Sequence, residues 1–178
     1  MLLAKDDMKE TAENRAAQFG QTEVLQKLLE WGNEKLTPEE LKSNLLLNKN
    51  RREQTAFHYA AHFGQTEVLQ QLWEWGTEKL TAEEINELLL AKDDMKETAF
   101  HRAAQFGQTE VLQKLLEWGN ENLTPEELKS NLLLNNKCRE QTAFHVAAHA
   151  GQTQVLQKLW EWGKEKLTPE ELKIHLSY

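Results

Sequence analysis

The sequence predicts an all-α protein built as a solenoid of four similar repeats. Three observations support this fold class: one phrase recurs at a regular interval, an amphipathic segment follows each copy, and each copy ends in a helix-capping pattern. The phrase begins at Thr11 as TAENRAAQFG and returns as TAFHYAAHFG, TAFHRAAQFG and TAFHVAAHAG at intervals of 44, 43 and 44 residues. Self-similarity at a period of about 20 to 50 residues is the signature of stacked repeat architectures.

We divide the chain, as one domain of residues 1–178, into repeats 1–44, 45–87, 88–131 and 132–178. The repeats alternate between two sequence variants. KDDMKETA opens the first and third repeats, whereas NKNRREQTA and NNKCREQTA open the second and fourth. The larger period is therefore 87 residues, a pair of repeats, which indicates duplication of a two-repeat unit.

The third repeat illustrates the first two helices that we expect in every copy. In TAFHRAAQFG, the small residues Ala103 and Ala104 allow close helix packing, and Gly107 is placed to end the helix in a left-handed conformation. In QTEVLQKLLEWG, apolar residues at 111, 112, 115 and 116 follow helical spacing, which predicts an amphipathic second helix. We expect Gly119 to end it.

A third helix is predicted by the pattern LTPEELKSN. Thr124 is the expected N-cap, Pro125 the first helical residue and Glu127 the partner in a capping box. Leu123 and Leu128 are spaced as a hydrophobic staple, and the same arrangement occurs at 36–41, 80–85 and 167–172, with Ala82 in place of proline in the second copy.

The stretch ETAFHRAAQFGQTEVLQKLLEWG resembles the ankyrin repeat, whose phrase T-P-L-H-x-A-A-x-x-G is followed by a V-x-x-L-L helix and a glycine. The resemblance covers about half of each repeat and occurs four times. It implies stacked antiparallel helix pairs with turn tips that project to one side. The period alone also suits HEAT or armadillo repeats. The phrase favours ankyrin-like repeats over another α-solenoid.

Three departures from the ankyrin pattern stand out. The third helix lengthens each repeat by about ten residues over the usual 33. Alanine replaces the usual proline at the helix start, at Ala12, Ala56, Ala99 and Ala143. The usual tip glycine, which permits a positive φ, is replaced by Lys9, Glu53, Lys96 and Glu140, so we expect looser or differently turned tips.

The first and last repeats differ from the inner ones in ways that suggest caps. Glu13 and Asn14 occupy the positions of Phe100 and His101. The resemblance implies that this phenylalanine packs in the core and that the histidine joins a hydrogen-bond network near the tips. We therefore expect Glu13 and Asn14 to be exposed, as a polar N-terminal cap. In the last repeat, Ala150 and Gln154 replace phenylalanine and glutamate, which makes a weaker cap.

Composition narrows the range of functions. The net charge is −8, which argues against general binding to nucleic acid. No apolar run approaches the roughly 20 residues of a membrane span, and the start MLLAKDDMKE becomes polar too early for a signal peptide. Cys138 is the only cysteine, so no intramolecular disulfide can form. We expect a cytoplasmic protein without a membrane or nucleic-acid partner.

No catalytic or metal site is expected. No nucleophile motif or glycine-rich phosphate loop occurs, and acid pairs such as Glu126 and Glu127 are explained by helix capping. His58 and His62 are four residues apart, as are His145 and His149, and could share a helix face that binds a metal. No carboxylate or cysteine within either helix completes such a site, and His58, His101 and His145 match the structural histidine of the phrase. We expect no cofactor and no enzymatic activity.

The six tryptophans favour a packing role, because four of them recur at one repeat position just before the second-helix glycine. The third helix is a candidate partner, and stacking on a ligand is the alternative. The recurring four are Trp31, Trp75, Trp118 and Trp162, with Trp73 and Trp160 in addition.

The tips carry the candidate binding residues. Acidic tips with Asp6, Asp7, Asp93 and Asp94 alternate with basic tips that bear Arg51, Arg52 and Arg139. These charges either attract one another or select a complementary partner. In ankyrin repeats, partners bind the tips and the outer side of the first helix. The matching positions here are Asp7, Met8, Gln18, Arg51, Arg52, Gln54, Tyr59, His62, Asp94, Met95, Glu97, Arg102, Gln105, Arg139, Gln141 and His149.

These features predict a non-catalytic module that binds a protein partner in a groove of tips and first helices. Charge reversal at Arg52 and Arg139 should then weaken binding and leave the fold intact. The alternative is a structural or engineered repeat scaffold with no native partner. We expect a monomer, and stacking of end faces between chains is the other alternative.

Overall fold

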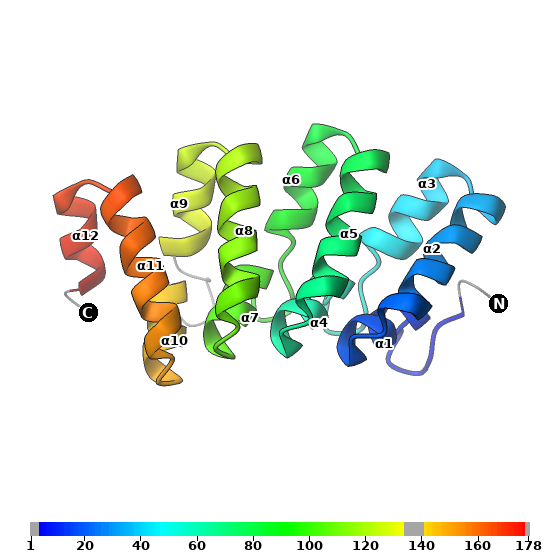
Figure 1. Cartoon of the computed structure of the whole chain (residues 1–178), viewed down its shortest axis with the longest axis horizontal. Helices are drawn as coiled ribbons and strands as arrows, with labels where there is room; N and C mark the ends of the chain where they lie inside the picture. Colours follow the sequence, from blue (N-terminus) through cyan, green and yellow to red (C-terminus); the bar gives the residue numbers. More distant parts are fainter. Residues whose placement is uncertain (1–3, 134–140, 177–178) are drawn as a thin grey trace.

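Figure 1 shows the computed structural model, an elongated array of helices in which residues 4–133 and 141–176 are described. Each repeat contributes three helices. The first helices are α1 (Ala12–Phe19), α4 (Ala56–Phe63), α7 (Ala99–Gln105) and α10 (Ala143–His149). The second helices are α2 (Thr22–Lys35), α5 (Thr66–Lys79), α8 (Thr109–Asn122) and α11 (Thr153–Lys166). The third helices are α3 (Pro38–Leu41) with its π-helical continuation η1 (Lys42–Leu46), α6 (Ala82–Leu90), α9 (Pro125–Leu133) and α12 (Pro169–Leu176).

Every regular element in the described residues is a helix, so the predicted all-α repeat solenoid is confirmed. The third helices of the first three repeats end at Leu46, Leu90 and Leu133. These ends lie just beyond the boundaries that we placed after residues 44, 87 and 131. Within the described part of the chain, no helix is both long and apolar enough to cross a membrane.

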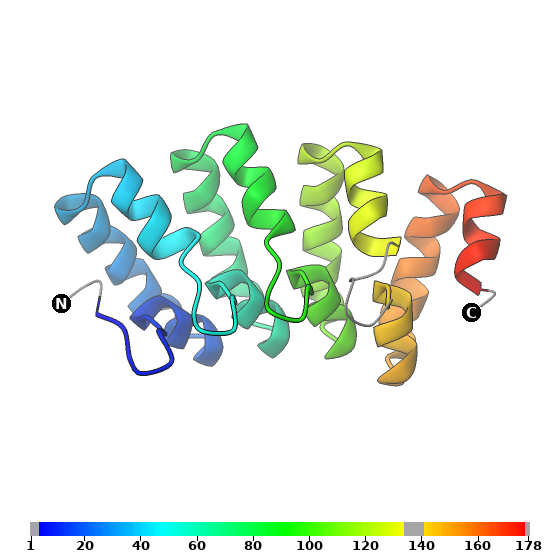
Figure 2. The same cartoon turned by 180° about the vertical axis from the view of Figure 1, so that it is seen from behind.

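The three sets of helices form three rows along the array. The first helices lie along one edge, the second helices are nearest the viewer in Figure 1, and the third helices are nearest the viewer in Figure 2. The first helices contact one another most extensively, because buried alanines such as Ala60, Ala61, Ala103 and Ala104 let their backbones approach closely. The segments that lead into α4 and α7 form the tips beside this row (Figure 2).

The second helices are one turn longer than predicted. Gly119 does not end α8, which continues to Asn122. Its role is close packing, because a Cβ atom on Gly119 would lie 2.8 Å from Cδ1 of Leu128 in the third helix. Gly107, in contrast, has the predicted left-handed conformation, with a φ of 72°.

The third helices begin as the capping pattern predicts. Thr37 and Glu40 form a reciprocal capping box, as do Thr81 and Glu84. Thr124 and Glu127 repeat the arrangement in α9, where the Glu127 carboxylate accepts the Thr124 backbone N–H at 2.8 Å. These local interactions fix the residue at which each third helix begins.

The tryptophans pack mainly between repeats. Trp75, Trp118 and Trp162 are buried, and Trp73 stacks on Trp118 of the following repeat with ring centroids 4.5 Å apart. The packing role is therefore confirmed for these residues, although the ring that covers Trp118 comes from the second helix α5 and not from a third helix. Trp31 is 52% exposed, which the recurrence did not predict.

The predicted N-terminal cap is wrong. Glu13 and Asn14 are only 1% and 2% exposed, as buried as Phe100 at 0%. The reason is the direction in which this position faces: Phe57, its counterpart in α4, contacts Trp118 of the following repeat. Position 13 therefore faces the second repeat and not the open end of the array. Ala150 and Gln154 are exposed, but Phe106 and Glu110 at the same repeat positions are exposed too, so exposure does not mark the last repeat as a cap.

Candidate protein-binding surface

Each described tip is a tight turn organised by its first residue. In the third repeat, Oδ1 of Asp93 accepts the backbone N–H groups of Met95 at 2.9 Å and Glu97 at 3.0 Å. Asp6 and Asn50 accept the same pair of bonds in the first two tips. The charge pattern predicted surface positions for Asp6 and Asp93 and did not indicate this role in the turn. The available signal was an Asp or Asn five residues before each of the first three phrases.

The tips keep a left-handed residue without a glycine. Lys9, Glu53 and Lys96 have φ values of 59°, 56° and 63°. The prediction of looser or differently turned tips is therefore wrong for these three, and Glu140 lies outside the described residues. The side-chain bonds from Asp6, Asn50 and Asp93 hold the turn, and they offset a left-handed conformation that costs a non-glycine residue about 1 kcal/mol.

Neighbouring tips are joined through their backbones. The N–H of Arg51 donates to the carbonyl of Met8 at 2.9 Å, and that of Asp94 donates to the carbonyl of Arg52 at 2.9 Å. The Arg52 guanidinium also lies 3.7 Å from the Asp94 carboxylate. Both side chains are about half exposed, so this ion pair adds little stability. Of the two junctions between described tips, the one between Arg52 and Asp94 shows this attraction between charges, and backbone hydrogen bonds connect the tips at both.

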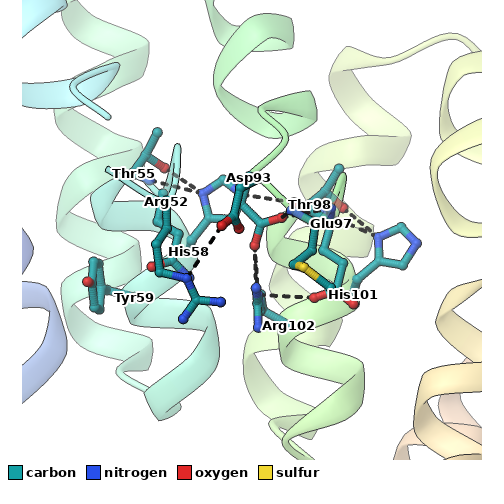
Figure 3. Close-up of polar contacts among 12 residues, drawn as sticks. Arg52, Thr55, His58, Tyr59, Asp93, Glu97, Thr98, His101 and Arg102 are labelled. Carbon is teal, nitrogen blue, oxygen red and sulfur yellow. Dashed lines mark hydrogen bonds and ion pairs between the residues drawn. The ribbon is translucent and has the colours of Figure 1, made fainter. Parts of the chain in front are cut away.

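Behind the third tip lies a buried ionic network (Figure 3). The Arg102 guanidinium contacts the Asp93 carboxylate and lies 3.3 Å from that of Glu97. Asp93 is 0% exposed, so the prediction of four exposed tip aspartates is wrong for this residue. The network connects the tip to α7 and makes the turn part of the folded core.

The second repeat replaces this ionic network with a neutral one. The Asn50 side-chain amide donates to the Tyr59 hydroxyl at 3.0 Å, and that hydroxyl donates to the Glu10 carboxylate of the preceding tip. Burial, together with the Glu10 carboxylate, raises the pKa of Tyr59 to about 12, so the hydroxyl keeps its proton. The first repeat has an ionic network like that of the third, in which the Arg15 guanidinium lies 3.0 Å from the Asp6 carboxylate and 2.8 Å from that of Glu10.

The phrase histidines are structural. Nδ1 of His58 accepts the Thr55 backbone N–H at 3.2 Å, and Nε2 donates to the Glu97 carbonyl of the next repeat at 3.1 Å. Burial lowers the pKa of His58 and of His101 to about 4, so both are neutral at physiological pH. Both ring nitrogens of His58 are thus occupied. Among the described residues, no group of three or more His, Cys, Asp or Glu side chains could hold a metal ion.

The expected binding residues divide by exposure. Three of them are buried, because they belong to the networks behind the tips: Gln54 (7% exposed), Glu97 (4%) and Arg102 (7%). Their assignment to the surface is wrong. Arg139 lies outside the described residues. The exposed or partly exposed ones are Asp7, Met8, Gln18, Arg51, Arg52, Tyr59, His62, Asp94, Met95, Gln105, Gln141 and His149.

A row of exposed phenylalanines, which were not among the predicted binding residues, lies at the ends of the first helices. Phe19, Phe63 and Phe106 are 62%, 42% and 38% exposed. His62 stacks on Phe106 with ring centroids 3.7 Å apart, and Tyr59 is parallel to Phe63 at 6.4 Å. The signal was a phenylalanine directly before the first-helix glycine in three repeats. Together with the exposed tips, these residues form what we call the tip–helix surface: Asp7, Met8, Arg51, Arg52, Asp94, His62, Phe63 and Phe106.

A polar hollow of about 670 Å³ lies elsewhere, at the starts of the second helices. It is lined by residues such as Gly64, Gln65, Glu67, Gln71 and Lys114, and by none of the expected binding residues. The candidate surface therefore rests on exposed side chains carried by an ordered backbone, and not on this hollow.

Comparisons with known proteins agree with this architecture. A family model described as ankyrin repeats in three copies matches residues 14–126. Among solved structures, a chain in the crystal structure of the yeast ribosomal protein Rps3 in complex with its chaperone Yar1 is similar, with a TM-score of 0.65 and 21% sequence identity. That similarity covers 82% of this chain and 86% of the other. Among curated proteins, no sequence match was found. Because the family model matches more than half of the sequence, the chain belongs to the ankyrin repeat family.

Proposed function

We propose that the chain is a non-catalytic module that binds a protein partner through the tip–helix surface. The observation that carries this proposal is the order of the tips: side-chain and backbone hydrogen bonds hold each described turn, and Arg51 and Asp94 bond to the neighbouring tips. Repeat proteins commonly bind through extended surfaces of this kind. The similar yeast structure is, by its title, also a complex between two proteins.

The mechanism is recognition by a surface that is rigid before the partner arrives. Because the tip backbones are already ordered, little conformational entropy is lost on binding. Arg51 and Arg52 offer exposed cationic groups at the tip, and Phe63 and Phe106 offer aromatic contact area at the far ends of the first helices. Aromatic and arginine side chains contribute most of the free energy in many interfaces. The complementary partner carries acidic groups next to an apolar patch.

The test is affinity capture from cell extract with three proteins compared side by side. The first is the parent, the second carries Arg51→Glu and Arg52→Glu, and the control carries Lys35→Glu and Lys164→Glu at exposed positions of α2 and α11. All three should show the same helical content and similar melting temperatures. The control matches the change in charge but leaves the tips intact.

We expect a protein that the parent and the control retain and the tip variant loses. A protein retained equally by all three, and bound directly when purified, would contradict the tip–helix surface as the binding site. Specific retention by none of them would favour the alternative of a repeat scaffold with no native partner.

A further inference from the structure

The outer faces of the first and last repeats expose residues that are buried at every internal junction. On the first repeat, Val24 is 50% exposed, whereas Val68 and Val111 at the same position are 0% and 1% exposed. On the last repeat, Trp160 is 37% exposed, whereas Trp73 is 7% exposed. At these described positions both faces keep the apolar residue types of the internal repeats, whereas terminal repeats of soluble arrays commonly have a polar outer face.

The two faces are also in register with each other. The sequence repeats every 87 residues, so the fourth and first repeats correspond to the second and third. At the junction of the second and third repeats, Trp73 stacks on Trp118 with an interplanar angle of 8°. The residues 87 positions away are Trp160 and Trp31, which is 52% exposed. The two halves of this stack therefore stand exposed on opposite ends of the array.

The two residues of a polar contact at the same internal junction likewise have counterparts on the two end faces. At the internal junction, the side chain of Gln108 packs over Gly64 and donates to the His62 carbonyl at 3.1 Å. The last repeat has Gly151 at the matching position, and a Cβ atom there would meet nothing within 4 Å. The first repeat has Gln21, which is exposed and instead bonds within its own repeat to the Phe19 carbonyl at 3.3 Å.

The two residues of an aromatic contact at the internal junction also have exposed counterparts on the two end faces. His62 stacks on Phe106 across the internal junction, with centroids 3.7 Å apart. The corresponding His149 is exposed on the last repeat, and Phe19 is 62% exposed on the first. The polar residues Glu13 and Asn14 do not interfere, because they are buried toward the second repeat.

We propose that these two faces bind each other in different copies of the chain, so that the last repeat of one copy packs against the first repeat of the next. The junction reproduces the internal one between the second and third repeats, with Trp160 on Trp31 and Gln21 over Gly151. Such a head-to-tail interface uses two different surfaces, so it continues into longer assemblies unless the ring closes. It engages Asp7 of the tip–helix surface, because the corresponding Asp94 contacts Arg52 at the internal junction, and it leaves the rest of that surface free. It does not rest on the proposed function.

The first measurement is sedimentation velocity of the parent over a wide range of concentrations. We expect a weight-average mass that rises with concentration above the 20.7 kDa of one chain, through dimers to longer species. A mass that stays at one chain up to about 1 mM, where even a weak interface would be half occupied, would overturn the proposal.

Two variants that block one face each decide the geometry. Trp31→Glu removes the first-repeat face and Trp160→Glu removes the last-repeat face, and both side chains are exposed, so the helical content should match the parent. Each variant alone should sediment as one chain. An equimolar mixture should form a one-to-one dimer and nothing larger, because only one intact face remains on each partner.

Phe63→Glu is the matched control, since Phe63 is an exposed aromatic residue on an internal repeat, and it should associate as the parent does. Association of Trp31→Glu alone to the parent's extent, or failure of the mixture to form dimers, would overturn the head-to-tail arrangement.

Discussion

The buried environment of Glu13 disfavours the charged form of its carboxyl group. It is 1% exposed, and neither carboxylate oxygen has a hydrogen-bond partner among the described residues. Burial raises the pKa of Glu13 for this reason. The first repeat therefore keeps a side chain whose charged form weakens the contact with the second repeat, where the other copies have a phenylalanine.

Replacement of this carboxyl should stabilise the protein at neutral pH. Because the folded-state pKa is raised, the penalty is absent below the unfolded value near 4.5 and grows as the pH rises through the folded pKa. We expect Glu13→Gln to increase the free energy of unfolding at pH 7 by about 1 to 3 kcal/mol, with the gain disappearing below pH 4. Urea unfolding at both pH values measures this. Exposed Glu34→Gln is the control, and an equal gain in both variants would contradict the explanation.

The buried histidines give a pH dependence of the opposite sign. His58 and His101 have pKa values of about 4 in the folded state, below the ordinary 6.5. The unfolded chain therefore binds more protons between these values, and stability is lost as the pH falls from 6.5 to 4. We expect roughly 3 kcal/mol of lost stability per histidine by pH 4.

Asn14 shows how this dependence can be reduced. Its Oδ1 accepts the Thr11 backbone N–H at 3.0 Å, as histidine Nδ1 does in the other repeats. His58→Asn should keep this bond and lose the bond to Glu97, so that stability at pH 7 falls by about 1 kcal/mol while the profile from pH 6.5 to 4 becomes flatter. Unfolding curves across this range test it; an unchanged slope in the variant would show that other groups cause the loss.

At the scale of elements, the networks behind the tips account for three positions of the first three repeats, whereas the fourth repeat has Lys137, Gln141 and Val146 at these positions. The ionic set Asp93, Glu97 and Arg102 and the neutral set Asn50, Gln54 and Tyr59 occupy the same three positions. The side chains of each set bond to one another, and Tyr59 also donates to Glu10 of the preceding repeat. Replacing one member alone would leave a buried polar group without its partner. In the second and third repeats, the residue types at these positions are therefore matched by the hydrogen bonds and ion pairs that they form.

An exchange of whole sets should be tolerated where a single change is not. Arg102→Met leaves Asp93 buried without its cation, and we expect the free energy of unfolding to fall by about 3 to 5 kcal/mol. The triple change Asp93→Asn, Glu97→Gln and Arg102→Tyr installs the neutral set and should be at least as stable as the parent, within about 1 kcal/mol. Urea denaturation compares the three proteins. A triple variant no more stable than Arg102→Met would refute the idea of matched sets.

The second-helix glycines offer a test of helix packing at one repeat position. On Gly76 a Cβ would be 3.5 Å from its nearest neighbour, an ordinary contact, whereas on Gly119 it would be 2.8 Å from buried Leu128. Gly76→Ala should gain about 0.5 to 1 kcal/mol from helix propensity. Gly119→Ala should lose about 1 to 3 kcal/mol from overpacking. Thermal unfolding compares the melting temperatures of the two variants. Equal changes in melting temperature would mean that α9 moves to accommodate the new methyl group as easily as α6 does.

At the scale of the whole molecule, one junction geometry repeats along the array. Glutamines such as Gln65 and Gln108 each reach the preceding repeat, where they bond to the carbonyls of Gln18 and His62 at 3.2 Å and 3.1 Å. Because each repeat contacts only its neighbours, stability is close to a sum over repeats and junctions. The same regularity leaves matching faces at the two ends, which is the basis of the proposed head-to-tail assembly.

The sequence by itself determined the number of repeats, the three helices in each and the residues at which most of them start. These features depend on local interactions, such as the capping box at Thr124 and the apolar spacing of α8, and local interactions can be read from neighbouring residues. The structural role of His58 was also predictable, because the phrase that contains it recurs.

Only the tertiary structure decided which side chains of the tips and first helices are exposed. Glu13 was predicted to be exposed in a terminal cap, Asp93 in a charged tip and Arg102 on the outer side of a first helix, and all three are buried. Trp31 and Phe106 are apolar and exposed. Burial at these positions depends on the neighbouring repeat and on the direction in which each position faces it. That direction is set by the packing of helices about 44 residues apart, which no local pattern encodes.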